Sequence, residues 1–255
     1  MKGKTAWVVG GSQGIGRGCA ESLIKEGVTV AITSRNEEKL EETCREIERQ
    51  FHVRAHAAAA DVTVQEQLEA AFASVMKQLQ KIDILIYAAG RSHLGQLFDT
   101  DSDDWMKNWK VNVLAFVETV KLVVPQMKTL GTGRIIVLGA SSGKEPTWNQ
   151  LVSNVTKGSL LSLVKSLALE LAPYNILVNN VCPGRFITPR RWYKAAKYGM
   201  PVEEYLKQVA EEVPLKRLGE VHEIADFITF LASEKGSYIT GQSINVDGGR
   251  VRSII

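Results

Sequence analysis

The sequence predicts an α/β protein built on a doubly wound parallel sheet. Short apolar runs rich in β-branched residues alternate with longer segments of helical periodicity through the N-terminal part of the chain. The later apolar runs are uninterrupted, which is typical of strands that helices cover on both faces. Because no tract rich in Pro, Gly or Ser and no repeat divides the chain, we expect a single domain over residues 1–255.

The expected elements follow from the local pattern in chain order. Three strand–helix pairs come first, at the spacing of βαβ units, and four further strands follow them. The pairs are Thr5 to Val9 with Gly14 to Glu26, Thr29 to Thr33 with Glu37 to Gln50, and Ala55 to Ala59 with Val64 to Leu79. The further strands are Ile82 to Ala88, Gly133 to Leu138, Ile176 to Val181 and Ser243 to Val246.

The stretch from Thr188 to Glu220 interrupts the alternation. It has no strand signal, and it follows a strand end, where sheets of this class bind ligands. It carries four basic residues, Arg190, Arg191, Lys194 and Lys197. We expect a substrate lid over residues 188–220, although a solvated pair of surface helices would explain the same charges.

The composition argues against several classes of function. The chain has 31 Lys and Arg residues, 28 Asp and Glu residues and a net charge of +3 without a basic block, so nucleic-acid binding is not expected. Cys19, Cys44 and Cys182 lack paired CxxC spacing, which indicates reduced thiols and no structural metal. Because the sequence has neither a signal segment nor a run of about 18 apolar residues, we expect a soluble, cytoplasmic protein with no membrane contact.

A glycine-rich turn follows the first expected strand and opens directly into a helix. Its residues are Gly10, Ser12, Gln13, Gly14, Ile15 and Gly16, with Gly11 between the first two. Glycines there let the backbone approach a pyrophosphate, and free N–H groups at the helix start attract an anion. A simple tight turn would also use glycine, but the βαβ context favours a dinucleotide site.

The end of the second strand favours one nicotinamide cofactor over the other. An NAD-binding protein usually carries an acidic residue here for the ribose 2′-hydroxyl, whereas Ser34 and Arg35 suit a 2′-phosphate. NADP(H) is therefore favoured over NAD(H). At the end of the third strand, Asp61 and Val62 are candidates for the adenine edge, although an Asp at this position is also a common helix cap.

A series of motifs extends over essentially the whole chain. The series is the glycine turn, Asp61, Tyr87-Ala88-Ala89-Gly90, Asn112, Lys157, Pro183-Gly184 with Thr188, and Val246-Asp247-Gly248-Gly249. Its order and spacing resemble the short-chain dehydrogenase/reductase (SDR) family, and the closing segment is similar to bacterial 3-oxoacyl-carrier-protein reductases and sugar or polyol dehydrogenases. The resemblance implies one Rossmann domain with a seven-stranded parallel sheet, assembled into homodimers or homotetramers.

The resemblance also implies a role for each matching residue. It assigns Gly10, Gly14 and Gly16 to the pyrophosphate, Ser34 and Arg35 to the 2′-phosphate, Asp61 and Val62 to the adenine, Ala89 and Gly90 to the length of the cofactor, Lys157 to the nicotinamide ribose, Pro183, Gly184 and Thr188 to the carboxamide, and Asn112 to a water of the proton relay. Val9 and Ala88 replace the Thr and Asn that are usual in the family, which removes supporting hydrogen bonds. We expect cofactor binding to survive these changes.

The catalytic residues depart from the family pattern. The family delivers a proton from a tyrosine four residues before the lysine, and a serine thirteen residues before the tyrosine holds the substrate oxygen. Counting back from Lys157 gives Ser153 and Ala140. Ser153 is not an equivalent acid, because an aliphatic hydroxyl is far less acidic than a phenol. Ser141 could take over the oxygen-binding role through a one-residue bulge, or simply bond its own loop.

Other side chains are candidates for the missing proton source. His93 lies in the loop after the fourth strand and has a suitable intrinsic pKa. Tyr193 and Tyr198 lie in the expected lid, and Lys157 itself could act as acid or base if it is desolvated.

Three functions stay open at this point. The favoured one is an NADP(H)-dependent oxidoreductase that acts on a small carbonyl compound or secondary alcohol. The basic residues of the lid indicate an acidic substrate. The alternatives are a catalytically silent protein that binds a cofactor or metabolite, and a lyase or isomerase that uses the same pocket. The resemblance implies a dimer interface on the helical segments Asp104 to Lys128 and Ser153 to Ala172.

Overall fold

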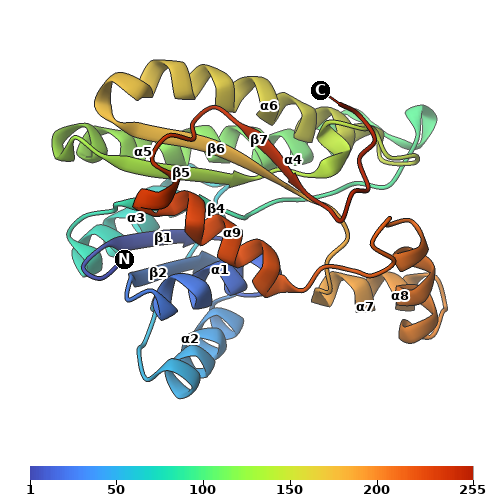
Figure 1. The fold of residues 1–255 in the computed structure, drawn as a ribbon, viewed down its shortest axis with the longest axis horizontal. Helices are drawn as coiled ribbons and strands as arrows, with labels where there is room; N and C mark the ends of the chain where they lie inside the picture. The colour runs from blue at the N-terminus through green and yellow to red at the C-terminus, as the bar shows by residue number, and fades with distance from the viewer. Residues whose placement is uncertain (255) are drawn as a thin grey trace.

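The computed structural model describes residues 1–254, in which seven parallel strands form one sheet with helices on both faces (Figure 1). The strand order is β3-β2-β1-β4-β5-β6-β7. The chain therefore leaves β1 in one direction for β2 and β3 and returns to the other side of β1 with β4, which creates a crevice at the carboxyl ends of these two strands. The doubly wound parallel sheet predicted from the alternation is confirmed.

The strand bounds agree closely with the expected ones. The strands are β1 (Thr5–Val9), β2 (Thr29–Ser34), β3 (His56–Ala59), β4 (Ile84–Tyr87), β5 (Gly133–Leu138), β6 (Ile176–Pro183) and β7 (Ser243–Val246). β1, β5 and β7 coincide with the predicted runs, while β4 begins two residues later and β6 ends two residues later. The agreement follows from burial, because every residue of β1, β4 and β5 is buried, and all but Thr5, Gly133 and Arg134 are hydrophobic.

Helices pack on both faces through two separate apolar clusters. Alternate residues of one strand point to opposite faces, so Trp7 and Val9 enter one cluster while Ala6 and Val8 enter the other. On the first face lie α3 (Gln65–Leu79), α5 (Ala115–Leu130) and α6 (Leu151–Leu171), and on the second lie α1 (Gly14–Lys25), α2 (Glu37–Phe51) and α9 (Val221–Ala232).

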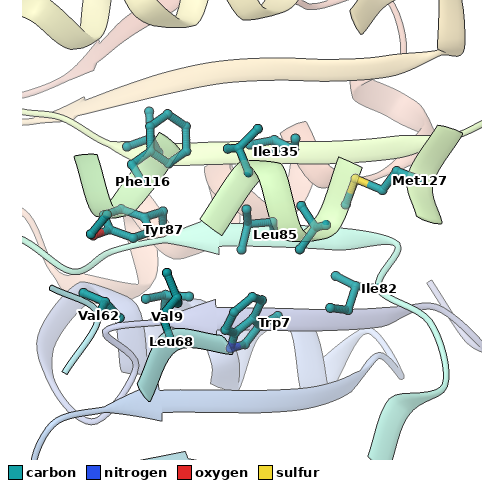
Figure 2. Close-up of a cluster of buried hydrophobic side chains, with 14 of the residues drawn as sticks. Trp7, Val9, Val62, Leu68, Ile82, Leu85, Tyr87, Phe116, Met127 and Ile135 are labelled. Carbon is teal, nitrogen blue, oxygen red and sulfur yellow. The ribbon is translucent and has the colours of Figure 1, made fainter. Parts of the chain in front are cut away.

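Figure 2 shows the first cluster, which holds the largest buried side chains of the sheet. Trp7 is fully buried, and its indole Nε1 donates a hydrogen bond to Thr33 Oγ1 at 2.8 Å, so its polar atom is satisfied. The rings of Tyr87 and Phe116 pack 5.4 Å apart between centroids. The cluster fixes β4 against α5, and the loop that leaves β4 therefore starts from a rigid base.

The helical segment expected from Asp104 to Lys128 is divided in the structure. It consists of α4 (Ser102–Trp109), one π-helical turn (Lys110–Leu114) and α5. Single π-turns inside helices occur frequently at functional sites. Here the turn carries Asn112, one of the predicted site residues.

Residues 188–220 contain α7 (Pro189–Lys197) and α8 (Val202–Glu211) and no strand, as expected. A small apolar cluster of Ala195, Tyr205, Val209 and Leu218 joins the two helices, which lie beside the sheet at the right of Figure 1. The three cysteines are buried and unpaired. Within residues 1–254, no helix is long and apolar enough to span a bilayer, and no group of potential metal ligands occurs.

Candidate active site

A cleft of about 820 Å³ lies at the carboxyl ends of the strands, over the point where the strand order reverses. The loops after six of the strands line it, together with the start of α7. The cleft brings together all the predicted site residues except Asn112, His93, Tyr193 and Tyr198: Gly10, Ser12, Gln13, Gly14, Ile15, Gly16, Ser34, Arg35, Asp61, Val62, Ala89, Gly90, Ser141, Ser153, Lys157, Pro183, Gly184 and Thr188. Residues spread over most of the chain therefore share one site.

The glycine turn forms a cradle that side chains would fill. Gly10 has φ of +86°, and a Cβ on it would lie 2.5 Å from the backbone nitrogen of Ala89. A Cβ on Gly16 would collide with the carbonyl oxygen of Gly10. The N-cap residue of α1, Gln13, makes no hydrogen bond from its side chain to the start of the helix, which leaves the first N–H groups available. This combination fits a pyrophosphate group.

The end of β2 presents the Ser34 hydroxyl and the exposed Arg35 cation to the cleft. Ser12 Oγ donates a hydrogen bond to Ser34 Oγ at 2.8 Å, which joins the glycine turn to β2. The side chain of Arg35 is 77% exposed, and its Nη1 lies 4.0 Å from Asp61 Oδ2. Such a weakly held guanidinium is free to turn toward a phosphate.

Asp61 closes the turn before α3 as well as lining the cleft, and it does not cap that helix, whose N-cap residue is Val64. Its Oδ1 accepts hydrogen bonds from Thr63 N at 2.9 Å and from Thr63 Oγ1 at 2.7 Å. Partial burial alone would raise the pKa of Asp61, but these hydrogen bonds and the charge of Arg35 lower it below the usual value. The carboxylate is therefore an anion and a hydrogen-bond acceptor at neutral pH.

Lys157 reaches the floor of the cleft from α6. Its Nζ donates a hydrogen bond to the carbonyl oxygen of Leu138 at 3.0 Å. Burial disfavours the ammonium form and lowers the pKa of Lys157 to about 8; Cys182 opposes this shift and the charge of Arg190 adds to it. A Cβ on Gly90 would lie 3.2 Å from Lys157 Nζ, so the loop after β4 passes directly over the amine.

Asn112 holds the loop after β4 from the π-turn. Its Nδ2 donates to the carbonyl oxygen of Arg91 at 2.9 Å and to Thr156 Oγ1 at 3.2 Å, and its Oδ1 accepts from Arg91 N at 3.0 Å. The amide side chain is thus bonded at both ends and does not line the cleft. Its place in a proton relay stays a prediction.

Ser153 and His93 are arranged differently from the expected geometry. Ser153 Oγ accepts a hydrogen bond from His93 N at 2.7 Å and donates one to His93 O at 3.1 Å. The hydroxyl proton is therefore already used to hold the backbone of this loop. The His93 ring does not face the cleft: its Nδ1 lies 3.3 Å from Asp104 Oδ1, so the ring points to α4 instead of to a substrate.

The other candidate proton donors also differ in position. Ser141 and Ser142 are buried at the cleft wall, where a 3₁₀ turn begins directly after Ala140. Tyr193 and Tyr198 are exposed, and neither lines the cleft. Among the described candidates with a nitrogen or phenol proton, Lys157 alone reaches the cleft.

Sequence reasoning missed several basic residues of the cleft wall. Among residues 1–254, the charged residues that line it are cations apart from Asp61: Arg35, Arg91, Lys107, Lys110, Lys157, Arg185, Arg190, Arg191 and Lys194. Lys107 and Lys110 are three residues apart at the junction of α4 and the π-turn, a spacing that puts both on one helical face. The spacing is visible in the sequence, but the cleft they face is visible only in the fold.

Comparison with known proteins identifies the family. A family model described as enoyl-(acyl carrier protein) reductase matches residues 9–250. The 3-oxoacyl-[acyl-carrier-protein] reductase FabG of Aquifex aeolicus is 33% identical over 249 residues, which cover 98% of this chain and 98% of FabG. The chain belongs to the short-chain dehydrogenase/reductase family.

Two further SDR relatives are similar over their whole length. The NADPH-dependent reductase BacG of Bacillus subtilis is 32% identical over 260 residues, covering 100% of both chains. The crystal structure of L-sorbose reductase from Gluconobacter frateurii, complexed with NADPH and L-sorbose, has a TM-score of 0.95 at 33% identity and covers 99% of this chain and 98% of that one. The resemblance inferred from the motifs is confirmed, and these SDR relatives are reductases.

Proposed function

We propose that this SDR protein is an NADP(H)-dependent oxidoreductase that acts on a carbonyl or secondary alcohol of a small molecule. One observation carries the proposal: a single cleft joins the glycine cradle and the Ser34–Arg35 pair at one end to Lys157 at the other. The NADPH dependence named for BacG and the NADPH complex of L-sorbose reductase support the choice of cofactor. The departures at Ala140 and Ser153 make the catalytic tetrad degenerate.

The residues that would hold the cofactor divide into three groups. The free N–H groups at the start of α1, with Gly10, Gly14 and Gly16, would bind the pyrophosphate, and Ser34 with Arg35 would bind the 2′-phosphate. Ser12, Gln13, Ile15, Asp61, Val62, Ala89, Gly90, Pro183, Gly184 and Thr188 would complete the cofactor site. When bound, NADPH supplies the hydride.

In this proposal the proton comes from Lys157. With a pKa of about 8, Lys157 is mostly protonated at neutral pH and is a stronger acid than an ordinary lysine. The Ser141 hydroxyl is the candidate to steady the substrate oxygen, while Asn112 positions the loop above the amine. Ser153 has a positioning role through the His93 backbone.

The lid and the assembly form a second part of the proposal. We infer that α7 and α8, within residues 188–220, cover the substrate end of a single-domain Rossmann subunit. Exposed apolar residues on α4, the π-turn and α6, namely Met106, Leu114, Val155 and Leu169, support a homodimer or homotetramer that forms through these helices.

A catalytically silent binding protein is the second candidate. The observation that favours it is the use of both hydrogen-bonding functions of Ser153 on His93, which leaves no hydroxyl acid at the tyrosine position. Such a protein would bind NADPH without turning over any carbonyl compound.

The test compares Lys157→Met with Lys165→Met, an exposed lysine on the same helix. NADPH consumption is followed by absorbance with a panel of ketones and aldehydes. Our proposal predicts turnover by the wild type and by Lys165→Met, and a loss of about a hundredfold or more in Lys157→Met because its general acid is gone. Turnover that survives in Lys157→Met would contradict the assigned proton donor, and binding without turnover in the wild type would favour the silent protein.

A further inference from the structure

Three cations at the start of α7 face the cleft. Arg190, Arg191 and Lys194 all line it. Arg191 is buried and donates from Nε to the carbonyl oxygen of Phe186 at 3.1 Å, so it is fixed in the wall. The guanidinium of Arg190 is more accessible and donates to Ser92 Oγ.

These three cations lack acidic partners. Within residues 1–254, no carboxylate lies within 4.0 Å of a charged nitrogen of Arg190, Arg191 or Lys194. The nearby Glu212 pairs with Arg185 and with Arg250. Partial burial lowers the pKa of Lys194 to about 8; the like charges of Arg190, Arg191 and Arg185 add to the shift, and the charge of Glu212 opposes it. An anion in the cleft would relieve this repulsion.

The cluster lies at the reaction end of the cleft. Arg190 contacts Ser92, two residues after Gly90, which passes over Lys157 Nζ. The charge of Arg190 also contributes to the lowered pKa of Lys157, so the two side chains are electrostatically close. The Ser34–Arg35 pair, in contrast, stands at the end of β2, where the cation is near Asp61.

We propose that Arg190, Lys194 and Ser92 form a second anion site, which binds a carboxylate or phosphate group on the substrate and thereby sets its class. This rests on the proposed function, because it names the substrate of the same cleft. The guanidinium of Arg190 would give up its hydrogen bond to Ser92 and bind the anion. Lys194, one turn further along α7, would contribute a second positive charge. The substrate is then a keto acid or a phosphorylated ketone, or the corresponding alcohol.

The experiment measures binding to the NADP⁺-loaded protein by calorimetry, because the oxidised cofactor cannot reduce the ketone during the titration. Levulinate is compared with its neutral methyl ester, and dihydroxyacetone phosphate with dihydroxyacetone. The variants are Arg190→Gln and Lys194→Gln, and the matched control is Lys197→Gln, which removes the same charge from an exposed position of α7 outside the cleft. We expect each cleft variant to lower the affinity for the anionic ligands by about tenfold or more. The control variant should leave that affinity unchanged. The anion that binds with the higher affinity shows whether the site prefers a carboxylate or a phosphate group.

Separate outcomes would overturn the proposal. If the cleft variants lower the affinity for NADPH as much as the affinity for the anions, the cluster belongs to the cofactor site. If Lys197→Gln lowers the anion affinity equally, the effect is one of overall charge and not of a site. Failure of both anions to bind saturably at millimolar concentration would also contradict it. Turnover on the same samples tests the proposed function independently, because anion binding without turnover contradicts the oxidoreductase and leaves the anion site intact.

Discussion

Arg35 stands at the end of β2 with most of its side chain in solvent, next to Ser34 and 4.0 Å from Asp61. A guanidinium in this position can make charge-assisted, two-pronged hydrogen bonds to a 2′-phosphate, whereas a 2′-hydroxyl offers it only one neutral acceptor. We expect Arg35→Ala to lower the affinity for NADPH by about 10- to 100-fold and to leave the affinity for NADH nearly unchanged. Titration calorimetry with both cofactors measures this, with Arg49→Ala on the exposed face of α2 as control. Equal losses for the two cofactors would refute the assignment.

Ser153 illustrates how a residue at a catalytic position can serve the fold instead. Its hydroxyl makes two hydrogen bonds to the backbone of His93 in a nearly solvent-free site. We expect Ser153→Ala to lower the free energy of unfolding by about 1–3 kcal/mol, because both backbone groups lose their partner. Denaturant titration gives the value, and Ser166→Ala, at an exposed hydroxyl of the same helix, should change it by about 0.5 kcal/mol or less. Unchanged stability with abolished turnover would instead make Ser153 the acid.

Lys157 links residue chemistry to the pH dependence of stability. Its pKa is about 8 in the folded protein against 10.5 for a lysine in water, so between these values the unfolded chain holds more protons at this site. The free energy of unfolding therefore gains from this group as pH rises from 8 to 10.5, by up to about 1.4 kcal/mol per pH unit. Denaturant titrations of the wild type and Lys157→Met across this window should diverge in favour of the wild type. If the free energies of unfolding of the two proteins instead depend on pH in parallel, the pKa of Lys157 is not lowered by folding.

At the scale of elements, the junction of β1 and α1 depends on a glycine. A Cβ on Gly16 would meet the carbonyl oxygen of Gly10 in the turn that forms the cradle. We expect Gly16→Ala to reduce the free energy of unfolding by about 1–3 kcal/mol and NADPH affinity by about tenfold or more. Gly158→Ala within α6 is the control, because its nearest contact would be Gly143 O at 3.4 Å, and helix propensity there favours alanine by up to about 1 kcal/mol. Normal NADPH binding by Gly16→Ala would contradict the cradle.

The sequence predicted elements well where burial imposes a strong pattern. β1 and β5 are buried along their length, so their apolar runs marked their bounds. The π-turn at residues 110–114 was not predicted, because the helical period of apolar residues continues across it and the extra residue per turn leaves little trace in composition. The glycine-turn end of the cleft was predictable for a related reason, since glycines and strand ends occur at fixed spacing.

The direction of loop side chains was not predictable from sequence. His93 follows a strand end as a substrate-facing residue would, but its ring pairs with Asp104 of α4, a contact set by how the loop folds back on Ser153. The uncompensated charge of Arg190 and Lys194 was equally hidden. Whether a surface cation has an acidic partner depends on tertiary contacts such as that of Arg185 with Glu212.

At the scale of the whole molecule, the exposed apolar residues of α6 predict assembly. Val155 and Leu169 are both exposed on this helix. We expect the wild type to run as a dimer or tetramer in light scattering after size-exclusion chromatography, and Val155→Lys with Leu169→Lys to shift it toward the monomer, because buried charges without partners destabilise an interface. Val53→Lys, at an exposed apolar residue after α2, is the control. A monomeric wild type would contradict the proposed interface.

The central claim is that one cleft binds NADP(H) and uses it on a carbonyl substrate. Its most direct test is a calorimetric titration of the purified protein with NADPH and NADH, followed on the same sample by the absorbance assay with ketones and aldehydes that carry a carboxylate or phosphate. We predict tighter binding of NADPH than of NADH, and NADPH oxidation with at least one of these compounds. Preferred binding of NADH, or NADPH binding without any turnover, would contradict this account.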